Sequence, residues 1–85
     1  MSYDYQTERP LIFTEEGMAI FMKIRDNVHK LLAQSGAVRM QEAVSVGSGD
    51  SWLKLACVDH LVERKELREV TPPGTTAGQH RVFVN

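Results

Sequence analysis

The stretch ELREVTPPGTTAGQHRVFVN, residues 66–85, decides the fold that this sequence predicts. It contains two short segments with alternating apolar residues, LREVT and QHRVFV, separated by the tract PPGTTAG. No apolar side chain in that tract is larger than alanine or proline, and such prolines and glycines are typical of a turn that cannot extend a strand ladder. Residues 67–84 are therefore predicted to form a β-hairpin with a loose tip.

Before the hairpin, residues 51–64 are predicted to form a helix that begins after the turn GSGD, with Asp50 as its N-cap. At helical spacing, one side of this segment is apolar and is expected to face the core. That inner stripe consists of Leu55, Val58, Leu61 and Val62. The opposite side consists of Leu53, Ala56, Cys57, His60 and Arg64.

A longer helix is predicted over residues 14–35, with Thr14 as its N-cap and acidic residues in its first turn, where the helix dipole favours negative charge. Gly36 stands where a helix commonly ends in a left-handed turn. The side expected to face the core carries Ile20, Phe21, Ile24, Val28, Leu31 and Leu32. Residues 37–39 are expected to be extended, and residues 40–46 to form a two-turn helix. Residues 1–13, interrupted by Pro10, are predicted to form a partly ordered arm.

The composition indicates one small domain. The chain has 85 residues, of which 42% are hydrophobic and 25% charged, as in ordinary globular proteins. We expect no membrane span, because no apolar run approaches the required length of about 18 residues, and no signal peptide pattern is present. The single cysteine excludes an internal disulfide and favours a cytoplasmic location. A chain of this size has little room for an enclosed catalytic cavity, so we do not expect an enzyme.

The element order of helix, extended segment, helix, turn, helix and hairpin resembles the winged helix-turn-helix family. Most of the likeness lies in LKLACVDHLVERKELREVTPPGTTAGQHRVFV, residues 53–84, which looks like a recognition helix, its exit and a wing. Glu66 stands where family members often have glycine. The resemblance implies an α+β domain over residues 14–85, with three helices and a C-terminal two- or three-stranded β-hairpin wing.

The resemblance also implies a small regulator, of transcription or of another process, that binds duplex DNA through helix 51–64 and the wing. The candidate DNA-contacting residues are Arg39, Ser48, Ser51, Lys54, His60, Arg64, Thr75, Thr76, Gln79, His80 and Arg81. The net charge of the chain, in contrast, counts against DNA binding. The net charge is −1, whereas phosphate neutralisation normally requires a positive surface.

The alternative function is a protein–protein interaction module on the same scaffold, without direct DNA contact. Leu53, Ala56 and Cys57 offer few hydrogen-bonding groups to base edges, so they fit either a surface for a partner or additional core against the arm. Met18 and Met22 lie outside the core stripe of the first helix. They either pack under arm residues or form the seam of a two-fold homodimer.

No metal or cofactor is predicted. Cys57 and His60 lie three residues apart on one helix, but a zinc site needs further ligands, and only His29 and His80 remain as soft donors. Cys57 is expected to be a structural thiol rather than a nucleophile, since no orienting acid or oxyanion donor is suggested nearby. Trp52 is expected to be a packing anchor more readily than a group that stacks on a base.

Overall fold

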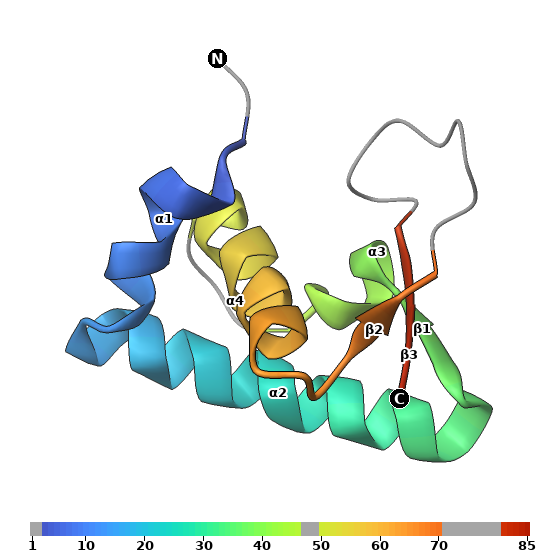
Figure 1. The fold of residues 1–85 in the computed structure, drawn as a ribbon. Helices are drawn as coiled ribbons and strands as arrows, with labels where there is room; N and C mark the ends of the chain where they lie inside the picture. Colours follow the sequence, from blue (N-terminus) through green and yellow to red (C-terminus); the bar gives the residue numbers. More distant parts are fainter. Residues whose placement is uncertain (1–2, 47–49, 71–80) are drawn as a thin grey trace.

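A computed structural model describes residues 3–46, 50–70 and 81–85, and these form an α+β domain. Figure 1 shows a long helix with the other helices and the strands arranged along it. The described elements are α1 (Tyr5–Ile12), α2 (Glu15–Ser35), β1 (Ala37–Arg39), α3 (Met40–Ala43), α4 (Ser51–Glu63), β2 (Arg68–Glu69) and β3 (Val82–Val84). None of the helices in these three ranges is long and apolar enough to cross a membrane.

The long helix α2 has the ends that the sequence predicts. Thr14 is its N-cap, and its hydroxyl accepts a hydrogen bond from the backbone N–H of Gly17 at 3.0 Å. Gly36 ends the helix in the left-handed region, at φ 77°, and its N–H donates to the Leu32 carbonyl. The helix buries Ile20, Phe21, Ile24 and Val28, as its spacing requires.

The prediction of three helices was wrong, because part of the arm forms a fourth helix, α1. Its N-cap Asp4 accepts from the backbone N–H of Gln6, and Pro10 lies in its last turn. Proline removes a backbone hydrogen-bond donor from a helix, so Pro10 by sequence alone predicts an interruption. Tertiary packing outweighs that cost, since Ile12 is completely buried and α1 packs against both α2 and α4.

The helix predicted over residues 40–46 is shorter in the structure, where α3 ends at Ala43. Ser45 explains where it stops. Its hydroxyl and its N–H both bond to the Glu42 carbonyl, at 2.8 and 3.3 Å. Serine commonly competes with helical bonding in this way.

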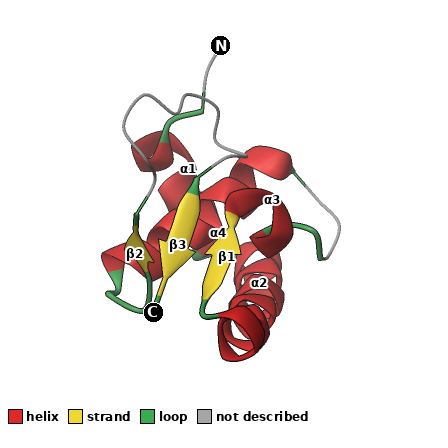
Figure 2. Cartoon of the chain, turned by 90° about the vertical axis from the view of Figure 1, so that its right-hand side faces the viewer, coloured by secondary structure: helices red, strands yellow, loops and turns green. Residues whose placement is uncertain are grey.

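The predicted hairpin pairing is confirmed for the described residues. β2 and β3 are antiparallel, with Arg68 opposite Val84 and Glu69 opposite Phe83. β1 pairs with the other edge of β3, which gives the strand order β1-β3-β2 seen in Figure 2. The predicted tip of the hairpin, at residues 71–80, lies outside the described residues.

Helix α4 lies between α1 and the strands, above α2 (Figure 1), and packs against both α1 and α2. Its inner stripe was only half right: Val58 and Leu61 are fully buried, whereas Leu55 and Val62 are only partly buried. The side predicted to be opposite the core is itself core. Leu53, Ala56, Cys57 and His60 are all buried. Of the two alternatives, additional core therefore accounts for this side, since both α1 and α2 pack against α4.

Candidate interaction surface

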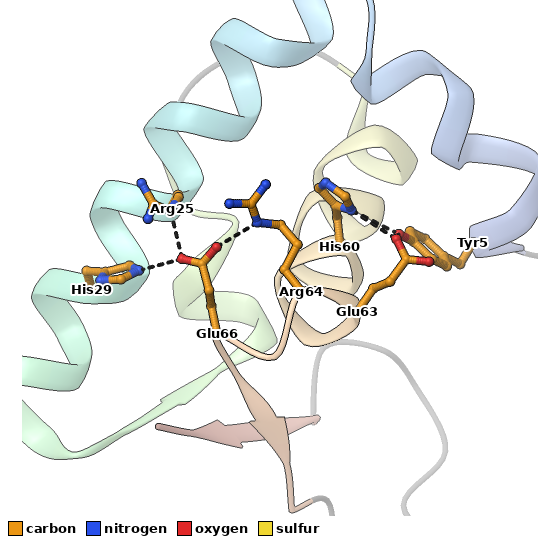
Figure 3. Close-up of polar contacts among 7 residues, drawn as sticks. All are labelled: Tyr5, Arg25, His29, His60, Glu63, Arg64 and Glu66. Atoms are coloured by element: carbon orange, nitrogen blue, oxygen red, sulfur yellow. Dashed lines mark hydrogen bonds and ion pairs between the residues drawn. The ribbon is translucent and has the colours of Figure 1, made fainter.

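The first polar cluster fastens α1 to the last turn of α4 through Glu63. The Tyr5 hydroxyl donates to Glu63 Oε1 at 2.8 Å, and Arg9 Nε donates to the same oxygen at 2.9 Å. Figure 3 shows Tyr5, His60 and Glu63 directed toward one another, with His60 Nδ1 3.1 Å from Glu63 Oε1. Hydrogen bonds from Arg9 and then Tyr5 lower the pKa of Glu63 to about 2.

His60 belongs to the packing of this cluster. It is 5% exposed, and its ring lies 5.3 Å from the Phe13 ring and 5.1 Å from the Phe21 ring, measured between centroids. Its polar Nδ1 is within bonding distance of both Tyr5 and Glu63. Such a side chain cannot reach a DNA groove without leaving the core, although the sequence suggested it as a DNA contact.

The second cluster joins three parts of the chain on Asp59 of α4. The Tyr3 hydroxyl donates to Asp59 Oδ2 at 2.6 Å, and Arg81 Nη2 donates to Asp59 Oδ1 at 2.6 Å. Arg81 also donates to Glu69 of β2 at 2.7 Å. Burial and the bond to Asp59 raise the pKa of Tyr3. Arg81 was expected to contact phosphate, but here its positive charge faces two carboxylates.

The third cluster centres on Glu66, in the turn between α4 and β2. Its carboxylate accepts from Arg25 Nε at 2.8 Å and from Arg64 Nε at 2.7 Å, and it lies 3.2 Å from His29 Nε2 (Figure 3). Burial alone would raise the pKa of Glu66, but the bonds from Arg25, Arg64 and His29 outweigh it and lower the pKa to about 2. The turn takes its left-handed residue at Lys65, with φ 66°, and not at Glu66 where the family resemblance places glycine.

Three of the candidate DNA contacts are arginines that face carboxylates of the chain itself. Arg64 and Arg81 form ion pairs, and Arg39, which is 70% exposed, lies 4.0 Å from Glu42. Ser51 is exposed at the start of α4, and Lys54 is partly buried on the same helix. The remaining candidates, Ser48, Thr75, Thr76, Gln79 and His80, lie outside the described residues.

One side of α4 is only partly buried, and we call it the α4 strip. Its members are Trp52, Leu55, Asp59 and Val62, which are spaced three, four and three residues apart and so share one side of the helix. Sequence reasoning missed this strip because Leu55 and Val62 were assigned to the core. The sequence did contain a sign that a second side of α4 could be apolar. The segment is apolar on nearly all sides, as expected of a helix with neighbours around it.

A shallow hollow of about 400 Å³ lies at the Val62 end of the strip. Its lining combines an apolar floor with charged residues: Val62, Lys65, Leu67, Arg68, Glu69 and Asn85. Leu67 is 4% exposed and forms the floor, while Lys65 and Arg68 are exposed. This arrangement of an apolar centre and a charged rim is typical of a surface that binds another protein.

Large apolar side chains are also exposed on α2 and at the corner before it. Phe13, Met18 and Met22 are 52%, 36% and 43% exposed. Of the two alternatives for the methionines, burial under the arm is therefore not what the structure shows. Met18 and Met22 remain on the surface, where a partner could cover them.

The described residues provide neither a metal centre nor a reactive thiol. They contain no group of three or more His, Cys, Asp or Glu side chains that could hold a metal ion. Cys57 is completely buried, and this burial raises the pKa of its thiol to about 12. A thiol so protonated is a poor nucleophile at neutral pH.

Comparison of the chain with models of known protein families, with curated proteins and with solved structures finds no match.

Proposed function

We propose that this chain is a protein–protein interaction module on a winged-helix scaffold, and that it binds a partner protein through the α4 strip. The scaffold is supported by the order α2, β1, α3, α4, β2, β3 and by the strand order β1-β3-β2. In that scheme α4 holds the position of the recognition helix and β2 and β3 hold the wing. Helix α1 is an addition that packs against α4.

The observation that carries the proposal is the composition of the α4 strip. Reading DNA requires donors and acceptors aimed at base edges, and the usual side chains are Arg, Lys, Asn, Gln, Ser and Thr. The strip instead presents Trp52, Leu55 and Val62, and its one carboxylate, Asp59, is bonded to Tyr3 and Arg81. Apolar side chains, together with one carboxylate whose charge is already neutralised by an ion pair, suit the centre of a protein interface, from which water is excluded.

The second support is that the arginines nearest to α4 are engaged within the chain. Arg81 is held by Asp59 and Glu69, and Arg64 by Glu66. DNA binding through phosphate contacts would require these arginines to exchange carboxylates for phosphates. The duplex-DNA hypothesis therefore becomes the competing outcome of the test below.

The test is a site-specific photo-crosslink from the strip. A photoreactive benzoylphenylalanine replaces Trp52, which keeps an aromatic group at a partly buried position, and the protein is irradiated inside the cells that produce it. We expect a defined protein adduct at this position. The matched control places the same group at Lys30, an exposed residue of α2, where no such adduct is expected.

Duplex DNA is tested directly by fluorescence anisotropy at about 50 and 200 mM salt, because 6–10 phosphate contacts would weaken binding by roughly 10³–10⁵-fold over that range. We expect no binding with this steep dependence. Steep salt-dependent binding together with nuclease-sensitive adducts at position 52 would refute the proposal and favour a DNA-binding regulator.

A further inference from the structure

A line of residues along α2 has the spacing of a helix–helix seam. Glu15, Met18, Met22, Arg25 and His29 are separated by three, four, three and four residues, and we call them the α2 seam. This alternation keeps residues on one stripe of a helix and is the repeat used when two helices pack lengthwise. The core stripe of α2, with Ile20, Ile24 and Val28, occupies a different side.

The centre of the seam is apolar and open. Met18 and Met22 are 36% and 43% exposed, so a substantial part of each residue remains open on the surface. Phe13, at the corner between α1 and α2, is 52% exposed. Methionine adapts its shape to a facing surface, and contiguous exposed apolar side chains commonly mark a contact site.

The two seam residues that flank the methionines, Glu15 and Arg25, carry opposite charges. Glu15 is exposed in the first turn of α2, and Arg25 lies ten residues later. Arg25 is held in place because its Nε donates to Glu66 at 2.8 Å. A guanidinium has five N–H donors, so this bond orients the group while other donors can still serve another carboxylate.

We propose that the α2 seam binds the same seam of a second copy of this chain, with the two α2 helices antiparallel about a two-fold axis. In a two-fold interface, if one residue faces a second, the second must also face the first. Met18 would face the partner's Met22, and Glu15 would face the partner's Arg25. Both pairs are centred on the same sequence position, residue 20, so a single two-fold axis can generate both pairs.

The charges select the antiparallel arrangement. Parallel pairing would place each Glu15 beside the partner's Glu15 and each Arg25 beside the partner's Arg25, and like charges repel at such distances. Antiparallel pairing replaces these repulsions with two symmetry-related ion pairs around the methionines. Exposed ion pairs contribute mainly to specificity, so most of the affinity must come from covering the apolar centre.

Sedimentation equilibrium of the full chain over a range of concentrations tests the dimer. We expect a reversible dimer whose dissociation constant rises at least about tenfold when Met18 and Met22 are both replaced (M18K/M22K). These side chains are exposed enough for the fold to tolerate lysine, which circular dichroism and thermal melting would verify. Lys30→Ala, on exposed surface of α2 outside the seam, is the matched control and should leave the constant unchanged.

Disulfide trapping tests the register. Met18→Cys protein is mixed with Met22→Cys protein under mild oxidation, and the two should link to each other, because a disulfide needs Cα atoms within about 7 Å. The buried Cys57 stays out of the reaction. Preferential linking of Met18→Cys protein to itself would indicate parallel pairing and refute the proposal.

A chain that remains monomeric at about millimolar concentration, or a dimer that ignores M18K/M22K, would also refute it. Neither result bears on the α4 strip, since the seam and the strip lie on different helices. The two proposals can therefore fail separately.

Discussion

Gly17 lies where the start of α2 passes beside the end of α1. A Cβ atom added to Gly17 would lie 1.9 Å from the Leu11 carbonyl oxygen and 2.9 Å from the Ile12 Cα. Both are backbone atoms, which cannot move aside as a flexible side chain can. The missing side chain thus allows the two helices to approach closely enough for Ile12 to be buried.

Because of this close contact, we expect replacement of Gly17 by alanine to destabilise the fold, whereas the same replacement in an ordinary helix stabilises it. In an ordinary helix, Gly→Ala stabilises by about 1 kcal/mol, and the sequence alone suggests that Gly17 carries such a cost. We expect Gly17→Ala instead to lower the free energy of unfolding by roughly 1–3 kcal/mol, as overpacking does. Urea denaturation would measure the change.

Gly36→Ala is the comparison for that measurement. Gly36 has φ 77° but nothing within 4 Å of an added Cβ, so its substitution should cost only the left-handed backbone strain, about 1–2 kcal/mol. An increase in stability from Gly17→Ala would show that α1 does not approach α2 as the structure has it.

Among the elements, the turn between α4 and β2 depends on one carboxylate. Glu66 bonds to Arg25 and lies close to His29, both on α2, and it also bonds to Arg64 at the end of α4. It therefore ties the exit of α4 to the long helix. Where the family resemblance leads one to expect glycine, this chain has a residue with a structural role.

The lowered pKa of Glu66 predicts an acid dependence of stability. The folded-state pKa is about 2 and the ordinary value is 4.5, so the bonds contribute fully above pH 4.5 and are lost as the pH falls toward 2. We expect Glu66→Gln to be less stable than the wild type at pH 7 and to lose less stability between pH 5 and pH 2.5. Urea titrations at several pH values would measure both effects.

The control is Glu16→Gln, which removes an exposed carboxylate from the first turn of α2. It should change the acid dependence much less. Glu63, whose pKa is also lowered to about 2, should retain its share of the acid dependence in both variants. An acid dependence that is identical in the wild type and Glu66→Gln would contradict the proposed role of Glu66.

Local signals in the sequence were sufficient for most elements. Thr14 and Asp50 were recognised as N-caps and Gly36 as a helix end because capping depends on a few neighbouring residues. The hairpin followed from alternation on either side of a turn-rich tract. By contrast, α1 contains Pro10, and its stability comes from docking on α4, which no local pattern reveals.

The candidate site was less predictable because it depends on contacts between distant residues. Arg81 meets Asp59 across 22 positions, and Tyr3 meets Asp59 across 56. Which of two apolar sides of α4 faces inward depends on the packing of distant elements. The sequence therefore predicts Leu55 in the core and leaves the side of Cys57 open between a partner surface and core against the arm. The structure places Cys57 in the core and leaves Leu55 partly exposed.

For the molecule as a whole, α4 is the element around which the others are arranged. It packs against α1 and α2, and its buried residues include Ala56, Cys57, Val58 and Leu61, none of which is measurably exposed. Amide hydrogens in such a position exchange only when most of the surrounding structure opens.

Hydrogen exchange measured by NMR should therefore find the slowest amides between residues 56 and 61. Amides of α1 should exchange faster, because this helix has only 8 residues and buries only Glu8 and Ile12. Equal protection in α1 and α4 would mean that the two open as one unit. Faster exchange in α4 than in α1 would contradict its central position.

The strand order also fixes when a nascent chain can complete this domain. Among the described strands, β1 and β2 do not pair with each other, and each pairs with β3, which comes last of the three in the sequence. Until the ribosome has released β3, both earlier strands lack their hydrogen-bonding neighbour, and Asp59 lacks Arg81. Helices can form early during translation, but the sheet closes only after synthesis has passed residue 84, in a late and long-range step.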